Sequence, residues 1–209
     1  MKWWGWGYED VSFDDSNKPA LWPYLKSELD IIEEAHTPPV KFEKVELPEP
    51  KINDGFLNAI KGVLNEGQIE SDKKTRLIHA AGKSFRDLWR LRNGIVKCAP
   101  DFVLFPENEK DVAAIVSAAN EHGAVLIPFG GGSNIAGCLE PRDRDDRVVV
   151  SLDMCRMHKV LEVDQRSLTA RIQPGVYGQH MEDQLLDHGV TLGHFPDSFL
   201  HSTLGGWVA

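Results

Sequence analysis

The chain has 209 residues, 42% of them hydrophobic and 26% charged, which is ordinary for a globular protein of one or two domains. Its formal net charge is -9, so the chain has no surplus of basic residues, and this argues against binding to nucleic acid. No apolar run approaches the roughly 20 residues that span a bilayer. The first ten residues, MKWWGWGYED, lack the apolar core and cleavage site of a signal peptide. Three scattered cysteines without metal-ligand spacing, Cys98, Cys138 and Cys155, are typical of a reduced compartment, so we expect a cytoplasmic protein.

Residues 1–50 predict an irregular N-terminal segment. Prolines interrupt any continuous helix there because proline lacks the amide hydrogen that a helix uses. The prolines are Pro38, Pro39, Pro48 and Pro50. We expect the early tryptophans to pack on the core of the rest of the protein, as aromatic side chains generally do, and not to stack on a ligand. They are Trp3, Trp4, Trp6 and Trp22.

The stretch NDGFLNAIKGVLNEG, residues 53–67, predicts the first amphipathic helix. Asp54 has the side chain of an N-cap, and Gly67 is placed to end the helix. Its apolar face consists of Leu57, Ile60 and Leu64.

A second helix is predicted at KSFRDLWRLRNG, residues 83–94. Ser84 and Asp87 have the spacing of a capping box. We interpret its basic residues as a solvated face; they are Arg86, Arg90 and Arg92. The segment between the two helices, residues 69–83, is predicted to be a loop.

From residue 101 the pattern changes to alternating strands and helices. Residues 101–106 predict a strand, 108–123 a helix with Asn108 as cap and Gly123 at its end, and 124–129 a second buried strand. The apolar face of this helix is expected to hold Val112, Ile115, Val116 and Ala119. The order strand, helix, strand predicts a βαβ unit.

The remaining stretch continues the pattern. Residues 147–153 predict a third strand, with Asp153 capping its end, and residues 159–175 predict an antiparallel hairpin that ends in the turn QPG. A helix is predicted at 177–189, and residues 190–209 are predicted to be loop-like.

The second strand leads directly into the sequence IPFGGGSN. Consecutive glycines allow positive φ angles, and their amide N–H groups can all point at one anion. Ser133 and Asn134 could add side-chain donors, and Pro128 would stiffen the entry. The alternative interpretation is that the glycine run is only a mobile turn.

Two nucleotide-binding motifs fail on this run. A G-x-G-x-x-G fingerprint needs a third glycine where Ile135 stands, and a P-loop needs lysine where Cys138 stands. The glycine run therefore fits neither helix-based phosphate site.

The order of these motifs resembles the flavin-binding domain of the vanillyl-alcohol oxidase/PCMH flavoprotein superfamily. The match includes PFGGGSN, VVVSLDMCRMHKVLEVD, TARIQPGVYGQHMEDQL and GHFPDSFLHSTLGGWVA. The resemblance implies an α+β fold in which a PCMH-type FAD-binding domain of two small α/β subdomains, incomplete here, occupies residues 96–209. Residues 1–95 would form a mostly helical and irregular segment before it.

A narrower resemblance involves GWGYED and HAAGKSFRDLWRLRNG, together with the stretch GHFPDSFLHSTLGGWV. These match the alkyldihydroxyacetonephosphate synthase family. The resemblance implies an FAD enzyme that exchanges the acyl chain of acyl-dihydroxyacetone phosphate for a fatty alcohol, without net oxidation, in ether lipid synthesis. Two alternatives stay open: an FAD-dependent 2-hydroxy acid dehydrogenase or oxidase, and a scaffold without cofactor.

The resemblance also assigns two cofactor-binding segments. The first would hold the FAD pyrophosphate and comprises Pro128, Phe129, Gly130, Gly131, Gly132, Ser133 and Asn134. The second comprises Asp197, Ser198, Phe199, Leu200, His201, Ser202 and Thr203, where capping of a following turn is the alternative for Ser202 and Thr203. No histidine lies in the glycine run, so we expect FAD to be bound non-covalently.

The chain stops in the apolar, small-residue stretch STLGGWVA, whereas domains usually end in mobile residues. We therefore expect an N-terminal fragment that is inactive alone, with its catalytic residues beyond Ala209, and no metal site. The resemblance implies a small-molecule lipid or hydroxy-acid substrate, and a homodimer with peripheral membrane contact for the complete enzyme.

Overall fold

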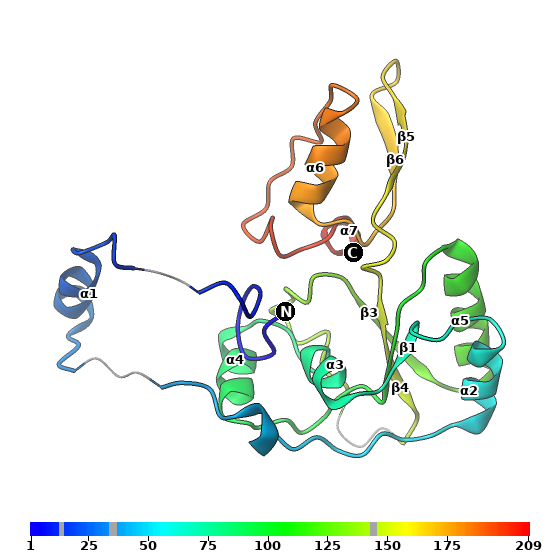
Figure 1. Ribbon diagram of the computed structural model, residues 1–209, viewed down its shortest axis with the longest axis horizontal. Coiled ribbons are helices and arrows are strands. Elements are labelled where there is room, and N and C mark those ends of the chain that lie inside the picture. Colours follow the sequence, from blue (N-terminus) through cyan, green and yellow to red (C-terminus); the bar gives the residue numbers. More distant parts are fainter. Residues whose placement is uncertain (13–14, 34–36, 143–145) are drawn as a thin grey trace.

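A four-stranded sheet with the order β1-β2-β4-β3 forms the centre of the larger of two lobes (Figure 1). β1 runs antiparallel to β2, whereas β2, β4 and β3 are parallel to one another. The strands are β1 (Ile69–Glu70), β2 (Phe102–Leu104), β3 (Val125–Phe129) and β4 (Val149–Asp153). The computed structural model describes residues 1–12, 15–33, 37–142 and 146–209.

β4 is the interior strand between β2 and β3, and all five of its residues are buried. β3 was predicted to be a buried strand, but it is the edge strand and most of it is only partly buried. Pro128 is exposed there, which suits an edge because proline cannot donate to a further strand. The two parallel strands β3 and β4 end side by side, at Phe129 and Asp153.

Helix α5 (Glu109–His122) connects β2 to β3, as the predicted βαβ unit requires. Asn108 caps it by accepting from the amides of Lys110 and Asp111, and Gly123 ends it in the left-handed region with φ of 70°. Val116 does not belong to the buried face as predicted, because it is 49% exposed. The buried side chains are those of Asp111, Ile115, Ala118 and Ala119.

Helix α2 (Asp54–Lys61) packs beside α5 and contributes to the same core. The predicted N-cap was wrong by one position: the side chain of Asn53 accepts from the amide of Phe56, and Asp54 is the first helical residue. The helix ends at Gly62 and not at Gly67. Phe56 is completely buried in the cluster that also holds the inward residues of β2 and β4.

The segment predicted as a loop contains β1 and helix α3 (Lys73–Ile78), which is capped by Asp72. Helix α4 (Phe85–Arg92) follows and is capped by Ser84, as predicted. A second core cluster lies among these elements and the N-terminal segment; its buried members are Trp3, Val45, Leu77, Ala81 and Leu91.

The N-terminal segment is less irregular than predicted, because it contains helix α1 (Leu21–Leu29) and a short 3-10 helix at Phe42–Lys44. α1 has no buried residue and stands away from the sheet (Figure 1). Among the tryptophans, Trp3 is buried as expected, whereas Trp6 and Trp22 are each 36% exposed. Residues 13, 14 and 34–36 of the predicted N-terminal segment lie outside the described residues.

The smaller lobe consists of the predicted hairpin and helix. The hairpin pairs β5 (Val160–Asp164) with β6 (Thr169–Ile172), and α6 (Gly178–Leu186) packs on it through Met181 and Leu185. The last stretch is not loop throughout, because it ends in the short helix α7 (Leu204–Val208). In the part of the chain that the structure describes, no helix is both long and apolar enough to cross a membrane.

The predicted boundary between residues 95 and 96 stays a prediction. α2 and β1 precede it in the chain, yet they share a core and a sheet with β2 and β4, which follow it.

Two neighbouring positions of α5 test this packing. Ile115 is 1% exposed, so Ile115→Ala should lower the free energy of unfolding by about 2–5 kcal/mol, through lost burial and the cavity left behind. Val116 is 49% exposed, so Val116→Ala should change it by less than about 0.5 kcal/mol. Urea unfolding followed by circular dichroism measures both, and equal losses would contradict the observed orientation of α5.

Candidate functional site

The glycine loop, defined as residues 130–134, leaves the sheet directly after Phe129 at the end of β3. Gly131 and Gly132 are buried, and no described residue accepts a hydrogen bond from an amide of this loop. Buried amide groups in native proteins nearly always have a partner. A run of unpaired main-chain donors beside Gly132, whose φ is +69°, is therefore suited to hold an anion.

The second predicted segment packs directly on this loop. A Cβ at Gly130 would lie 2.1 Å from Thr203 Oγ1, and a Cβ at Gly131 would lie 1.9 Å from the carbonyl oxygen of His201. The fold thus brings together two segments about 70 residues apart in sequence, as the two-segment prediction requires. Only glycine allows this approach, because any side chain would overlap the neighbouring backbone.

The side chains of the second segment have different environments. The Ser202 hydroxyl donates to the carbonyl oxygen of Ser198 (2.9 Å) and accepts from Trp207 Nε1 (2.6 Å), so it holds its own segment together. Thr203 occupies the N-cap position of α7, but its side chain makes no capping hydrogen bond. Asp197 and Leu200 are exposed, and Phe199 lies against Gly178.

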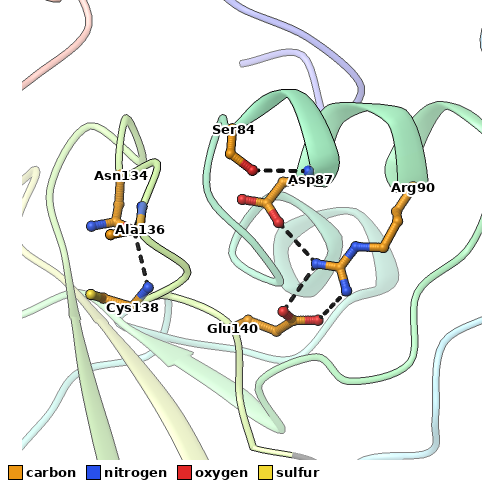
Figure 2. A network of polar contacts seen from close by, with 7 residues as sticks. All are labelled: Ser84, Asp87, Arg90, Asn134, Ala136, Cys138 and Glu140. Atoms are coloured by element: carbon orange, nitrogen blue, oxygen red, sulfur yellow. Dashed lines mark hydrogen bonds and ion pairs between the residues drawn. The ribbon is translucent and has the colours of Figure 1, made fainter.

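Asn134 closes the glycine loop through its own side chain. Its Oδ1 accepts from the amides of Ala136 and Cys138, each at 3.0 Å (Figure 2). This oxygen therefore shapes the chain after the loop, so the side-chain contribution of Asn134 to an anion site would fall to its Nδ2 group.

Arg90 of α4 fastens the chain that follows the loop. Its guanidinium donates to both carboxylate oxygens of Glu140, at 2.7 and 3.0 Å, and to Asp87 at 2.9 Å (Figure 2). These bonds, those to Glu140 first, raise the pKa of Arg90. The predicted solvated face was therefore wrong for Arg90, whose side chain is only 14% exposed.

The connector between α3 and α4, residues 79–84, supports the end of the loop. The amide of Lys83 donates to the carbonyl oxygen of Asn134 (2.8 Å), and a Cβ at Gly82 would lie 1.9 Å from that oxygen. Burial lowers the pKa of Lys83 to about 8, and its Nζ donates to the carbonyl oxygen of Lys2. The sequence predicts residues 79–83 only as loop, although they open the stretch HAAGKSFRDLWRLRNG that resembles the synthase family.

A buried histidine–aspartate pair lies beneath the start of the loop and was missed by the sequence analysis. His79 Nε2 is 2.9 Å from Asp153 Oδ2, and the His79 ring lies 4.1 Å from that of Phe129. Asp153 Oδ1 accepts from the amide of Cys155, which confirms its prediction as a strand-end cap. His79 and Asp153 are 74 residues apart, so no local sequence signal connects them.

The turn QPG joins the two lobes. A Cβ at Gly175 would lie 1.7 Å from the carbonyl oxygen of Met154, and the amide of Gly205 donates to the carbonyl oxygen of Pro174 (2.8 Å). This turn therefore holds the chain directly after the second segment through the bond to Gly205. Among the described residues, no group of three or more His, Cys, Asp or Glu side chains is placed to hold a metal ion.

The class of protein follows from comparison with known families. The profile of the FAD binding domain family matches residues 100–209, more than half of the chain. The chain belongs to this family, and FAD is its cofactor. The α+β, PCMH-type fold expected from the sequence is thereby confirmed.

The more particular likeness is to alkyldihydroxyacetonephosphate synthases. The enzyme of Dictyostelium discoideum is 43% identical over 198 residues, covering 91% of this chain and 32% of that enzyme. The enzyme of Trypanosoma brucei brucei is 43% identical over 164 residues, covering 78% of this chain and 27% of that enzyme. A solved alkyldihydroxyacetonephosphate synthase superposes with a TM-score of 0.91 at 39% identity, covering 99% of this chain and 42% of the other. The chain thus spans about a third of the length of its curated relatives.

More distant relatives match only part of the chain. Glycolate oxidase subunit GlcD of Bacillus subtilis is 32% identical over 107 residues, which is 51% of this chain and 22% of that protein. The 4-ethylphenol oxidase of Gulosibacter chungangensis, with a TM-score of 0.55 and 24% identity over 76% of this chain and 29% of the other, shows the fold alone.

The residues present fit the pyrophosphate of FAD. The unpaired amides of the glycine loop supply several donors to one anion, and glycines leave room for close approach. The fit uses main-chain groups, which explains why the loop needs neither the lysine of a P-loop nor the helix of a dinucleotide fingerprint.

Gly131→Ala tests the contact between the two segments. The new methyl group would overlap the backbone at His201, so FAD affinity should fall by about 5- to 160-fold, the equivalent of the roughly 1–3 kcal/mol typical of overpacking. Gly206→Ala is the matched control, because the nearest atom to its Cβ would be 3.8 Å away. Quenching of FAD fluorescence measures both affinities, and equal affinities would contradict the proposed close approach.

Cysteine reactivity tests the environment of Asp153. Burial, and then the charge of Asp153, raise the pKa of Cys155 to about 12, so its thiol stays protonated at pH 8. Cys138 is exposed. Iodoacetamide at pH 8 should therefore alkylate Cys138 well before Cys155, as followed by peptide mass spectrometry, since the thiolate is the reactive form. Unfolding in urea should remove the difference, and early alkylation of Cys155 in the folded protein would contradict it.

Proposed function

We propose that this chain is the FAD-binding N-terminal part of an enzyme of the alkyldihydroxyacetonephosphate synthase type. Such an enzyme replaces the acyl chain of acyl-dihydroxyacetone phosphate with a fatty alcohol and so makes an ether lipid precursor. The observation that carries the proposal is the buried glycine loop with unpaired amides, seated on residues 201–203. Its support is the likeness to the synthases, which extends over 91% of the chain.

In this proposal the main chain of residues 130–134 holds the FAD pyrophosphate, while residues 201–203 form the facing wall. Main-chain amides suit this task because they are fixed by the fold and cost little reorganisation on binding. The absence of a histidine from the glycine run supports non-covalent binding. FAD, when bound, supplies the exchange chemistry, and this part of the protein binds and orients it. No catalytic residue is assigned to this chain.

The second candidate function is that of an FAD-dependent dehydrogenase of 2-hydroxy acids. Its support is the partial match to glycolate oxidase subunit GlcD, which covers 51% of the chain. The Caenorhabditis elegans alkyldihydroxyacetonephosphate synthase, in contrast, matches over 100% of it at 32% identity. The higher identity and coverage, 43% over 91% of the chain for the Dictyostelium discoideum enzyme, therefore favour the synthase. We further propose a cytoplasmic enzyme that is a homodimer and touches membranes peripherally when complete, by analogy with its lipid substrate class.

The full-length protein tests this function. Purified with FAD, it should be yellow and should exchange acyl for alkyl when given acyl-dihydroxyacetone phosphate and a fatty alcohol, as detected by mass spectrometry of the lipid product. Anaerobic 2-hydroxy acids should leave its flavin absorbance unchanged. Bleaching by these acids would instead support the dehydrogenase, and a colourless protein would overturn both readings.

A further inference from the structure

We propose that His79 is a positioning residue for the cofactor site, and that it acts through its buried hydrogen-bonded pair with Asp153 beneath the glycine loop. The proposal rests on the proposed function in one respect, namely that the glycine loop holds FAD. It adds a role for a residue far from the loop in sequence.

A continuous stack of groups connects His79 to the loop. The His79 ring packs against the ring of Phe129 at 4.1 Å, and both side chains are buried, at 4% and 2% exposure. The Phe129 ring in turn lies beneath Gly132, where a Cβ would be 2.6 Å from Phe129 Cζ. The Phe129 ring therefore packs against the loop at Gly132, and the His79 ring packs against Phe129.

The hydrogen bonds of His79 involve both nitrogens of its ring. Its Nδ1 is 2.7 Å from the carbonyl oxygen of Thr75, which can only accept, so Nδ1 carries a hydrogen. Its Nε2 faces Asp153 Oδ2 at 2.9 Å, and the other oxygen of Asp153 already accepts from the amide of Cys155. Both ring nitrogens of His79 and both oxygens of Asp153 are therefore engaged in hydrogen bonds.

Two of the groups near Asp153 are a thiol and a phenol. Cys155 and Tyr177 both lie within its field; burial first, and then the charge of Asp153, raise the pKa of each, so both stay neutral. Among the described residues, His79 is the ion-pair partner that the structure gives to Asp153. A buried carboxylate without that partner would be strongly unfavourable, and it would lie at the end of the strand next to β3, beneath an anion site.

The pair also ties three elements together at the point where the loop begins. His79 follows α3, Asp153 ends β4, and Phe129 ends β3. Both partners are buried within these described elements, so the pair does not lie on a surface that the rest of a longer protein would cover.

Three variants of the full-length FAD protein test the proposal: His79→Phe, Asp153→Asn and the double variant. His79→Phe keeps a ring against Phe129 but leaves the carboxylate alone, so the dissociation constant for FAD should rise about tenfold or more, as expected when one partner of a buried charge pair is removed. The double variant removes both partners and should bind FAD more tightly than His79→Phe does. Such non-additivity is the signature of a direct pair.

The measurements separate positioning from general destabilisation. FAD affinity is measured by fluorescence quenching. The temperature is set about 20 °C under the apoprotein melting temperature of each variant, so that every variant is folded. His188→Phe, at an exposed site after α6, is the control and should bind FAD like the wild type. At saturating FAD, His79→Phe should regain most of the wild-type kcat, because it affects cofactor placement and not the reaction.

Each result has one meaning. If His79→Phe binds FAD like the wild type, or if the double variant is as weak as the two single losses combined, the role of the pair is overturned while the proposed function stands. If the wild type itself binds no FAD, the proposed function fails first.

Discussion

The whole arrangement depends on one close approach, that of the glycine loop to the segment 201–203. The approach is so close that a methyl group at Gly130 would overlap the Thr203 side chain, and one at Gly131 would overlap the backbone of His201. Gly131 and Gly132 are buried there, and the loop amides have no acceptor among the described residues, so they can donate to an anion. The same constraint that packs the two segments therefore produces the geometry on which the proposed FAD site depends.

Several other groups of the structure hold this contact in place. Phe129 and His79 lie beneath the start of the loop, the connector 79–84 holds its end through Asn134, and Arg90 anchors the chain beyond it. The turn at Pro174 and Gly205 fixes the facing segment from the smaller lobe. A main-chain anion site needs such support because its donors have no side-chain freedom with which to adjust.

Local sequence signals predicted many of the elements but not their surroundings. The caps at Ser84 and Asn108, the hairpin and helix α5 follow from short-range hydrogen bonding and periodicity, and they were predicted correctly. Helices α1 and α3 were missed, and α1 begins with Pro23 in its first turn, where proline is tolerated although it interrupts a helix elsewhere. Val116 was misplaced on a buried face because two adjacent apolar residues of one helix cannot be ranked without knowing the direction of the core.

By itself, the sequence determined the run of glycines, its place after a strand, and the family resemblance that names FAD, because each of these lies in contiguous residues. Only the tertiary structure decided that Gly130 meets Thr203, that Ser202 serves its own segment, that Arg90 is an anchor and that His79 pairs with Asp153. The physical reason is that these contacts join residues from 50 to 74 positions apart, or depend on which face of an element is buried. Such pairings are set by the packing of the whole core, and no local pattern encodes them.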